Sequence, residues 1–236
     1  MSKPQRLQKK GQCAYCGQYD TLTVDHVIPR CLFDGVIGGV PGDVPRVDAC
    51  LQCNNTKSAG DTFLRDVLVR DMRLVEQPIA QSIRHGAHAR SLAKGKSQYP
   101  RAASRLQYVP SPTGSGLWIA EPILPKERLH GIFTQLVRGP MVAYEHYELS
   151  GTTNFDVMRA ADAKIALTDA LHWAADTSGS GMIHTVHAGG GSVFWCVYYH
   201  SLTLGYLNLS QWWLRFYEHA VYWVGTDMSN LSLGKF

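Results

Sequence analysis

Two pairs of cysteines with the same spacing constrain the fold of this 236-residue chain more than any other feature. Cys13 and Cys16 are separated by two residues, and so are Cys50 and Cys53. One tight turn with this spacing directs two thiolates at one ion, and two such turns complete a tetrahedral zinc site. Residues 11–60 are rich in Gly, Pro, Asp and Cys, so they cannot build a large core unaided. We therefore predict a structural Zn²⁺ whose binding supplies folding free energy.

Each cysteine pair taken alone has two other interpretations, a redox pair or two unbound thiols. Cys31 and Cys196 match no ligand spacing, and we interpret them as small apolar residues. Six cysteines in the whole chain are too few for a disulfide scaffold, which favours reduced thiols and a cytoplasmic protein. Hydrophobic residues make up 45% of the chain and charged residues 18%, which excludes a disordered polymer. No apolar run approaches the roughly 18 residues of a membrane span, so we expect a soluble protein without a membrane partner.

Positive charge is concentrated in the first part of the chain. Residues 1–105 contain 16 Lys and Arg against 9 Asp and Glu, whereas residues 106–236 contain 7 against 10. No acidic residue occurs between Glu76 and Glu121, and His85 and His88 fall in this gap. We predict a basic linker over 77–116 that contacts nucleic acid through Arg84, Arg90, Lys94 and Lys96. The alternative is a solvated, flexible linker, and we assign the two histidines to the basic surface in either case.

The remaining pattern predicts an α+β protein with three parts. Residues 1–76 form an N-terminal domain, in which 21–24 is a strand and 61–76 a helix with Asp61 as its N-cap. After the linker, 117–236 form a C-terminal α+β domain of unknown role. Within it we predict a helix over 126–148 broken at Gly139 and Pro140, and a second helix over 161–175. Residues 193–200 and 211–225 are predicted as strands of an antiparallel sheet.

Between and after the cysteine pairs lie two further motifs. Asp25 and His26 are followed by Pro29 and Arg30, and the second pair continues as Cys-Asn-x-x-Lys, ending at Lys57. In this order the motifs resemble the HNH endonuclease family in its form with four zinc-binding cysteines. The resemblance covers about residues 11–60 and implies a ββα-metal finger. In such a finger a strand delivers Asp-His, a hairpin returns, and a helix begins near the second cysteine pair.

The resemblance also implies residue roles. His26 matches the general base, and Asp25 and Asn54 match ligands of a catalytic Mg²⁺ or Mn²⁺. Arg30 and Lys57 match basic positions near the phosphates. The family usually has a central Asn that positions the catalytic loop before the second cysteine pair, but residues 43–49 contain none.

Elementary chemistry supports the same residue types. A His with an ordinary pKa of about 6.5 is largely neutral near pH 7 and can accept a proton from water. Asp and Asn oxygens suit a hard divalent cation that stabilises charge on a phosphate. Because adjacent strand residues point to opposite faces, Asp25 and His26 require a twist or bulge to face one phosphate.

The sequence therefore predicts a metal-dependent endonuclease that hydrolyses phosphodiester bonds in DNA, and the resemblance implies products with 5′-phosphate and 3′-hydroxyl ends. Two alternatives stay open. The first is a zinc-finger module that binds nucleic acid without cleaving it. The second is an interaction protein in which the finger is only structural and the C-terminal domain binds a protein partner or forms a homo-oligomer.

Overall fold

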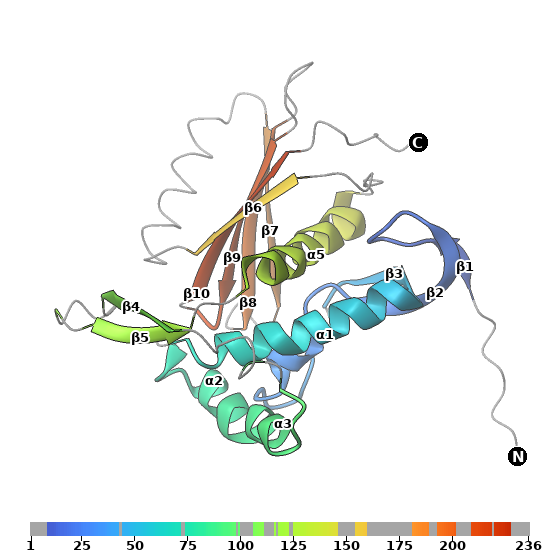
Figure 1. Cartoon of the computed structure of the whole chain (residues 1–236). Coiled ribbons are helices and arrows are strands. Elements are labelled where there is room, and N and C mark those ends of the chain that lie inside the picture. The colour runs from blue at the N-terminus through green and yellow to red at the C-terminus, as the bar shows by residue number, and fades with distance from the viewer. Residues whose placement is uncertain are drawn as a thin grey trace, which may run out of the picture.

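The computed structural model describes most of the chain and shows an α+β fold, as the sequence predicts (Figure 1). The described residues are 9–42, 44–71, 74–97, 99, 106–110, 116, 118–122, 125–145, 154–159, 181–188, 193–201, 209–218 and 220–227. The predicted helix over 161–175 lies outside them. None of the described helices is long and apolar enough to cross a membrane.

A small antiparallel sheet followed directly by a long helix forms the N-terminal part. Its strands are β1 (Lys10–Gln12), β2 (Tyr19–His26) and β3 (Arg46–Cys50), in the order β1-β2-β3. A 3₁₀ turn, η1 (Arg30–Phe33), follows β2, and helix α1 (Leu51–Leu68) begins immediately after β3. The predicted strand at 21–24 lies within β2.

The predicted start of the first helix is wrong, because α1 begins at Leu51 rather than near Asp61. Its N-cap is Cys50, whose sulfur accepts a hydrogen bond from the Cys53 amide at 3.4 Å. The first half of α1 packs beside the cysteines instead of against a wide apolar core. For that reason it lacks the apolar stripe by which an amphipathic helix is identified in sequence.

The segment predicted as a linker is partly helical. Helix α2 (Pro78–Ile83), a π-helical turn η3 (Arg84–His88) and helix α3 (Ala89–Ala93) follow one another without a break. Pro78 occupies the first turn, which suits its fixed φ, and Ala80 and Ile83 are buried one turn apart. This burial explains why 78–93 is not a flexible linker. A two-stranded hairpin follows, consisting of β4 (Leu106–Pro110) and β5 (Trp118–Pro122).

The C-terminal part is a five-stranded antiparallel sheet with one long helix against it. The strands are β6 (Asn154–Arg159), β7 (Gly181–Ala188), β8 (Phe194–Ser201), β9 (Leu209–Phe216) and β10 (Ala220–Asp227), in the order β6-β10-β9-β8-β7. The predicted strand at 193–200 corresponds to β8. The predicted single strand at 211–225 is instead the hairpin β9-β10, which turns at Tyr217 and Glu218 with positive φ angles of 46° and 68°.

Helix α5 (Lys126–Glu145) lies between this sheet and α1 (Figure 1). It continues through Gly139 and Pro140 without the predicted break. Gly139 lies against Val27, so that a Cβ at this position would come within 2.7 Å of a Val27 methyl carbon. The glycine therefore serves close helix packing rather than a change of direction.

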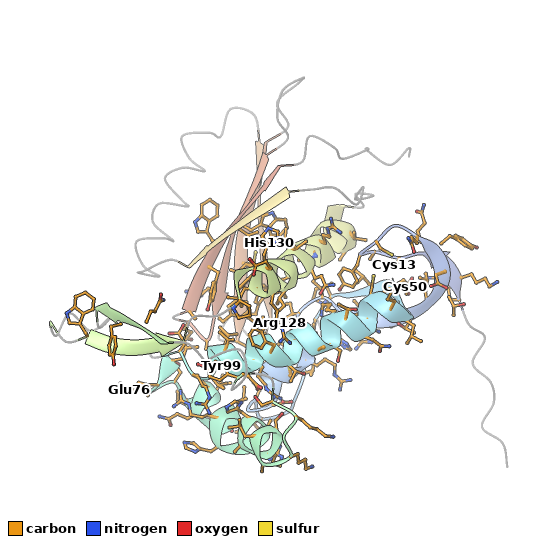
Figure 2. The ribbon with its side chains drawn as sticks, viewed as in Figure 1. Cys13, Cys50, Glu76, Tyr99, Arg128 and His130 are labelled. Carbon is orange, nitrogen blue, oxygen red and sulfur yellow. The ribbon has the colours of Figure 1, made fainter. Side chains whose placement is uncertain are left out.

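One buried apolar cluster joins the two parts that the sequence predicted as separate domains. It contains Phe63 and Leu64 of α1 together with Phe133 of α5 and Phe216 of β9. The buried Tyr217 hydroxyl donates to the Leu32 carbonyl at 3.0 Å, and the Arg128 guanidinium lies 4.0 Å from the Phe63 ring centroid (Figure 2). The N-terminal sheet and α1 are thus held against the C-terminal sheet by shared packing.

Candidate metal centre and His26 site

The four paired cysteines come together at the N-terminal end of α1. Figure 2 shows Cys13 and Cys50 side by side where α1 meets the small sheet. All four sulfurs lie within 4.8 Å of one another, and those of Cys16 and Cys50 are 4.0 Å apart. A tetrahedron with Zn–S bonds of about 2.3 Å has edges of about 3.8 Å. The cluster could therefore hold a metal ion, and its donor set fits Zn²⁺.

No other cluster of three or more His, Cys, Asp or Glu donors occurs among the described residues. All six cysteines are free thiols. Burial favours the neutral form of Cys13, but neighbouring backbone hydrogen bonds outweigh this effect and lower its pKa to about 7. The Tyr15 amide, for example, donates to the Cys13 sulfur at 3.4 Å. Backbone donors thus already stabilise negative charge at this sulfur.

Arg138 of α5 lies beside the cysteine cluster. Its Nη1 donates to the Tyr15 carbonyl, in the turn between Cys13 and Cys16, at 2.8 Å. Burial lowers the pKa of Arg138, while negative charge on Cys53 and Cys16 opposes this shift. The contact ties the first cysteine turn to the C-terminal part of the chain and places a cation near the cysteine sulfurs.

The pairing of β2 with β3 decides which way the candidate catalytic residues face. The register runs without interruption from Leu22 opposite Cys50 to His26 opposite Arg46. It therefore contains no bulge at Asp25 or His26. Directly opposite residues share a face, so His26 lies with Arg46 on one face and Asp25 on the other.

The face that carries His26 is open and positively charged. Arg46 and Arg30 are exposed, and His26 is half-buried. Burial lowers the pKa of His26, and the positive charges of Arg46 and Arg30 lower it further. The imidazole is therefore neutral at physiological pH and stands among two arginines that attract anions.

The opposite face turns Asp25 toward α1. Asp25 Oδ2 accepts a hydrogen bond from the Tyr15 hydroxyl at 2.7 Å and lies 3.4 Å from Lys57 Nζ. Asn54, one helical turn before Lys57, donates from Nδ2 to Thr23 Oγ1 at 2.8 Å. Oδ1 of Asp25 and Oδ1 of Asn54 make no hydrogen bond with the residues that the structure describes. Both oxygens lie along the seam between β2 and α1, and as hard donors they fit a divalent cation.

Lys57 does not contact solvent, contrary to the predicted phosphate contact. Its side chain is 1% exposed, and its ammonium donates to Asp61 Oδ2 at 2.8 Å and to the His26 carbonyl at 2.9 Å. Burial raises the pKa of Asp61 to about 6, although Lys57 opposes this shift. Because the ammonium is surrounded by protein acceptors, it cannot reach a bound phosphate.

Some basic residues of the predicted linker, 77–116, are buried or partly buried, and others are exposed. Arg84 is half-buried and donates from Nε to the Val69 carbonyl at 2.6 Å, so part of its hydrogen-bonding capacity serves the end of α1. His88 is buried rather than on the basic surface, while His85 is exposed. Three predicted nucleic-acid contacts, at Arg90, Lys94 and Lys96, are exposed.

These exposed cations are distant from His26 along α1. The helix carries Lys57 beside His26 and Asp66 beside η3, and nine residues of helix span about 13 Å. The structure therefore brings the four cysteines together and ties Asn54 to Thr23, on the same face of β2 as Asp25. The exposed cations Arg90, Lys94 and Lys96 lie instead near the other end of α1.

Sequence reasoning missed Arg46, Tyr15 and the role of Asp61. The spacing of Lys57 and Asp61, four residues apart, was a readable signal for a helical ion pair. Arg46 could be found only from the strand register.

Comparison of the chain with protein-family models, curated proteins and solved structures gives no match in any of the three.

Proposed function

We propose that this protein is a metal-dependent, HNH-type endonuclease that hydrolyses phosphodiester bonds in DNA. The observation that carries the proposal is His26, held neutral between Arg30 and Arg46 at the end of β2. In this proposal β2, β3 and α1 form the ββα-metal finger, and Zn²⁺ on the four cysteines ties the hairpin to the helix. This arrangement presents a base and an anion-attracting surface together.

His26 would act as the general base. A neutral imidazole that is partly open to solvent can accept a proton from a water molecule next to a bound phosphate. Burial and the charges of Arg46 and Arg30 lower the pKa of His26, which favours the unprotonated ring that a base requires. Arg46 and Arg30 would hold the phosphate through charge-assisted hydrogen bonds.

Asp25 and Asn54 would hold Mg²⁺ or Mn²⁺ through their side-chain oxygens. Asp25 and Asn54 lie on the other face of β2 from His26, so this role requires β2 to twist at its end. The bound cation would then supply Lewis-acid stabilisation of the negative charge that develops on the phosphate and the leaving oxygen. Tyr15 fixes the Asp25 carboxylate through its hydroxyl, so this ligand is oriented before any cation binds. A tetrathiolate site also requires reduced cysteines, which is consistent with our assignment of the protein to the cytoplasm.

One observation favours a second function, a zinc-finger module that binds nucleic acid without cleaving it. Asp25 Oδ2 is satisfied by Tyr15 and faces the buried Lys57, so the carboxylate is compensated without a divalent cation. The exposed arginines around His26 would bind phosphates equally well in such a module.

Nicking of a supercoiled plasmid separates the two functions. We expect zinc-loaded protein to nick the plasmid with Mg²⁺ or Mn²⁺ and not with EDTA at a concentration that leaves zinc bound. His26→Ala should lower the rate by about 100-fold or more, the usual contribution of a general base. Its DNA affinity, measured by fluorescence anisotropy without divalent cations, should stay within about twofold. If wild type and His26→Ala bind DNA and are equally inactive, the protein is the binding module.

A further inference from the structure

We propose that Lys57 is a positioning residue that orders His26 through its main-chain carbonyl. The inference rests on the proposed nuclease function and assigns to Lys57 a different task from the phosphate contact that the sequence predicted. His26 is the last residue of β2, and the chain turns away at Pro29 and enters η1. On its other edge β2 is paired with β1 only over Tyr19–Thr21, so among the described strands the backbone at His26 has no partner there and needs another group to hold it.

The contact supplies such a partner. Lys57 Nζ donates to the His26 carbonyl at 2.9 Å, across 31 residues of sequence, from the second turn of α1. On the other side of this carbonyl, the Val27 amide donates to the Pro45 carbonyl at 2.9 Å. The peptide group that follows the His26 Cα is therefore fixed from both sides, which restricts where the imidazole can swing.

The negative charges around Lys57 stabilise its ammonium in the position from which it donates to the His26 carbonyl. An ammonium that is 1% exposed must be compensated, because transfer from water strongly disfavours a lone charge. Asp61 Oδ2 at 2.8 Å and Asp25 Oδ2 at 3.4 Å provide the compensation. The Asp61 carboxylate and the His26 carbonyl accept two of the three hydrogens of the ammonium, and Asp25 lies 3.4 Å away as a second counter-charge.

The same contacts connect His26 with the cysteine cluster. Tyr15 lies between Cys13 and Cys16, and its hydroxyl donates to the carboxylate of Asp25, which faces Lys57. A displacement of the first cysteine turn would thus reach the His26 carbonyl through Asp25 and Lys57. Through these contacts the cysteine cluster could hold His26 in position although the two do not touch.

The test compares Lys57→Met with Asp61→Asn. Lys57→Met keeps the chain length but removes every donor, whereas Asp61→Asn keeps an acceptor and leaves the bond to His26. With normal zinc content and helical circular dichroism, Lys57→Met should lower kcat for plasmid nicking by about 100-fold, as misplacement of a catalytic group does. KM should stay within about twofold, because no phosphate contact is lost. Asp61→Asn removes one of the two compensating carboxylates but keeps the donor to His26, so it should lower kcat less than Lys57→Met does.

Two readouts do not depend on activity. Hydrogen exchange of the peptide covering residues 24–33 should accelerate more in Lys57→Met than in Asp61→Asn. In wild-type protein labelled with ¹⁵N-lysine, the Lys57 ammonium should give a slowly exchanging signal. If wild type does not cleave DNA, the proposed function fails, and these readouts still decide whether Lys57 orders His26.

Four results would overturn the positioning role. They are an unchanged kcat in folded Lys57→Met, a raised KM with unchanged kcat, unaltered exchange at residues 24–33, and a Lys57 ammonium that exchanges rapidly with water. A Lys57→Met protein that neither folds nor binds zinc also overturns it, because Lys57 would then be a residue of the fold.

Discussion

Burial distinguishes residues of the same type that look equivalent in the sequence. Arg30 and Arg46 are exposed beside His26, whereas Arg65 is buried and donates to the Asp66 carboxylate from Nε at 3.0 Å and Nη2 at 2.7 Å. The composition of the N-terminal part counts all three arginines toward the same positive charge. Only tertiary structure separates the cations that are free to attract a polyanion from those that hold the protein together.

Asp66 illustrates a buried charge that is fully compensated. Besides Arg65, it accepts from Ser97, and its Oδ1 lies 2.9 Å from His88 Nδ1. The other ring nitrogen of His88 accepts from Arg70 Nε at 3.0 Å, which places the His88 proton on Nδ1. His88 is thus a neutral bridge between α1 and η3.

We expect Asp66→Asn to reduce stability in a pH-dependent manner. Burial opposes ionisation of Asp66, but hydrogen bonds from Ser97, His88 and Arg65 prevail and lower its pKa. A lowered folded-state pKa contributes stability that is present above the unfolded value of about 3.9 and is lost as the pH falls through the folded value. At pH 7 the variant should lose about 3 kcal/mol of unfolding free energy, as for a broken buried pair.

Urea denaturation between pH 3 and pH 7 checks this expectation. The difference between wild type and Asp66→Asn should shrink as the pH approaches 3, because wild type then loses the same contribution. A difference that is constant with pH would contradict the account of a stabilised carboxylate.

Sequence patterns predicted some single residues and not others. The four cysteines were recognisable because metal ligation requires a fixed local spacing. Burial of Lys57 and the pairing of His26 with Arg46 depend on which strand register and which helix face the whole chain selects. Tertiary packing determines this register and this helix face, so a local sequence pattern cannot predict them.

Among the elements, α5 was predicted because its apolar residues follow a helical period, and β8 because it is rich in aromatic residues and Val. The first half of α1 was missed since its partners are cysteines and polar side chains. Helices α2 and α3 were missed because α2 buries only Ala80 and Ile83 and α3 buries no residue, so the apolar pattern is too short to be recognised.

Packing of α5 against the small sheet can be tested with two glycines of the same helix. A Cβ at Gly139 would lie 2.7 to 3.3 Å from both methyl carbons and the Cβ of Val27. Because the β-branched Val27 side chain has few alternative rotamers, it cannot easily move out of the way. We expect Gly139→Ala to destabilise the protein by about 1 to 3 kcal/mol, typical of overpacking.

Gly131 provides the matched control. It is exposed on α5, and a Cβ there would meet nothing within 4 Å. Gly131→Ala should therefore stabilise the protein by up to about 1 kcal/mol through helix propensity. Thermal unfolding of both variants measures the contrast. Equal shifts in Tm would show that α5 does not press on Val27 as described.

For the molecule as a whole, the cysteine cluster and the shared core have different tasks. The core joins α1, α5 and the five-stranded sheet, whereas the small sheet has its own limited cluster around Tyr15, Val27 and Ala49. Because this cluster is small, we expect the fold of the small sheet and the start of α1 to depend on an ion bound by the cysteines.

Metal analysis tests this dependence. Purified protein should contain about one equivalent of zinc per chain by mass spectrometry, because one tetrathiolate site binds one ion. Cys13→Ser should contain less zinc and lose order in residues 9–50 by hydrogen exchange. A zinc-free protein with native exchange in this region would show that the finger folds without the ion.

Chemical rescue of His26 tests the central claim most directly. His26→Gly removes the imidazole and leaves a space beside Arg46, so plasmid nicking with Mg²⁺ or Mn²⁺ should fall by about 100-fold or more. Added imidazole should restore part of the rate in His26→Gly and leave wild type unchanged. Nicking by His26→Gly at the wild-type rate, or a defect that imidazole does not relieve, would contradict the role of His26 as the general base.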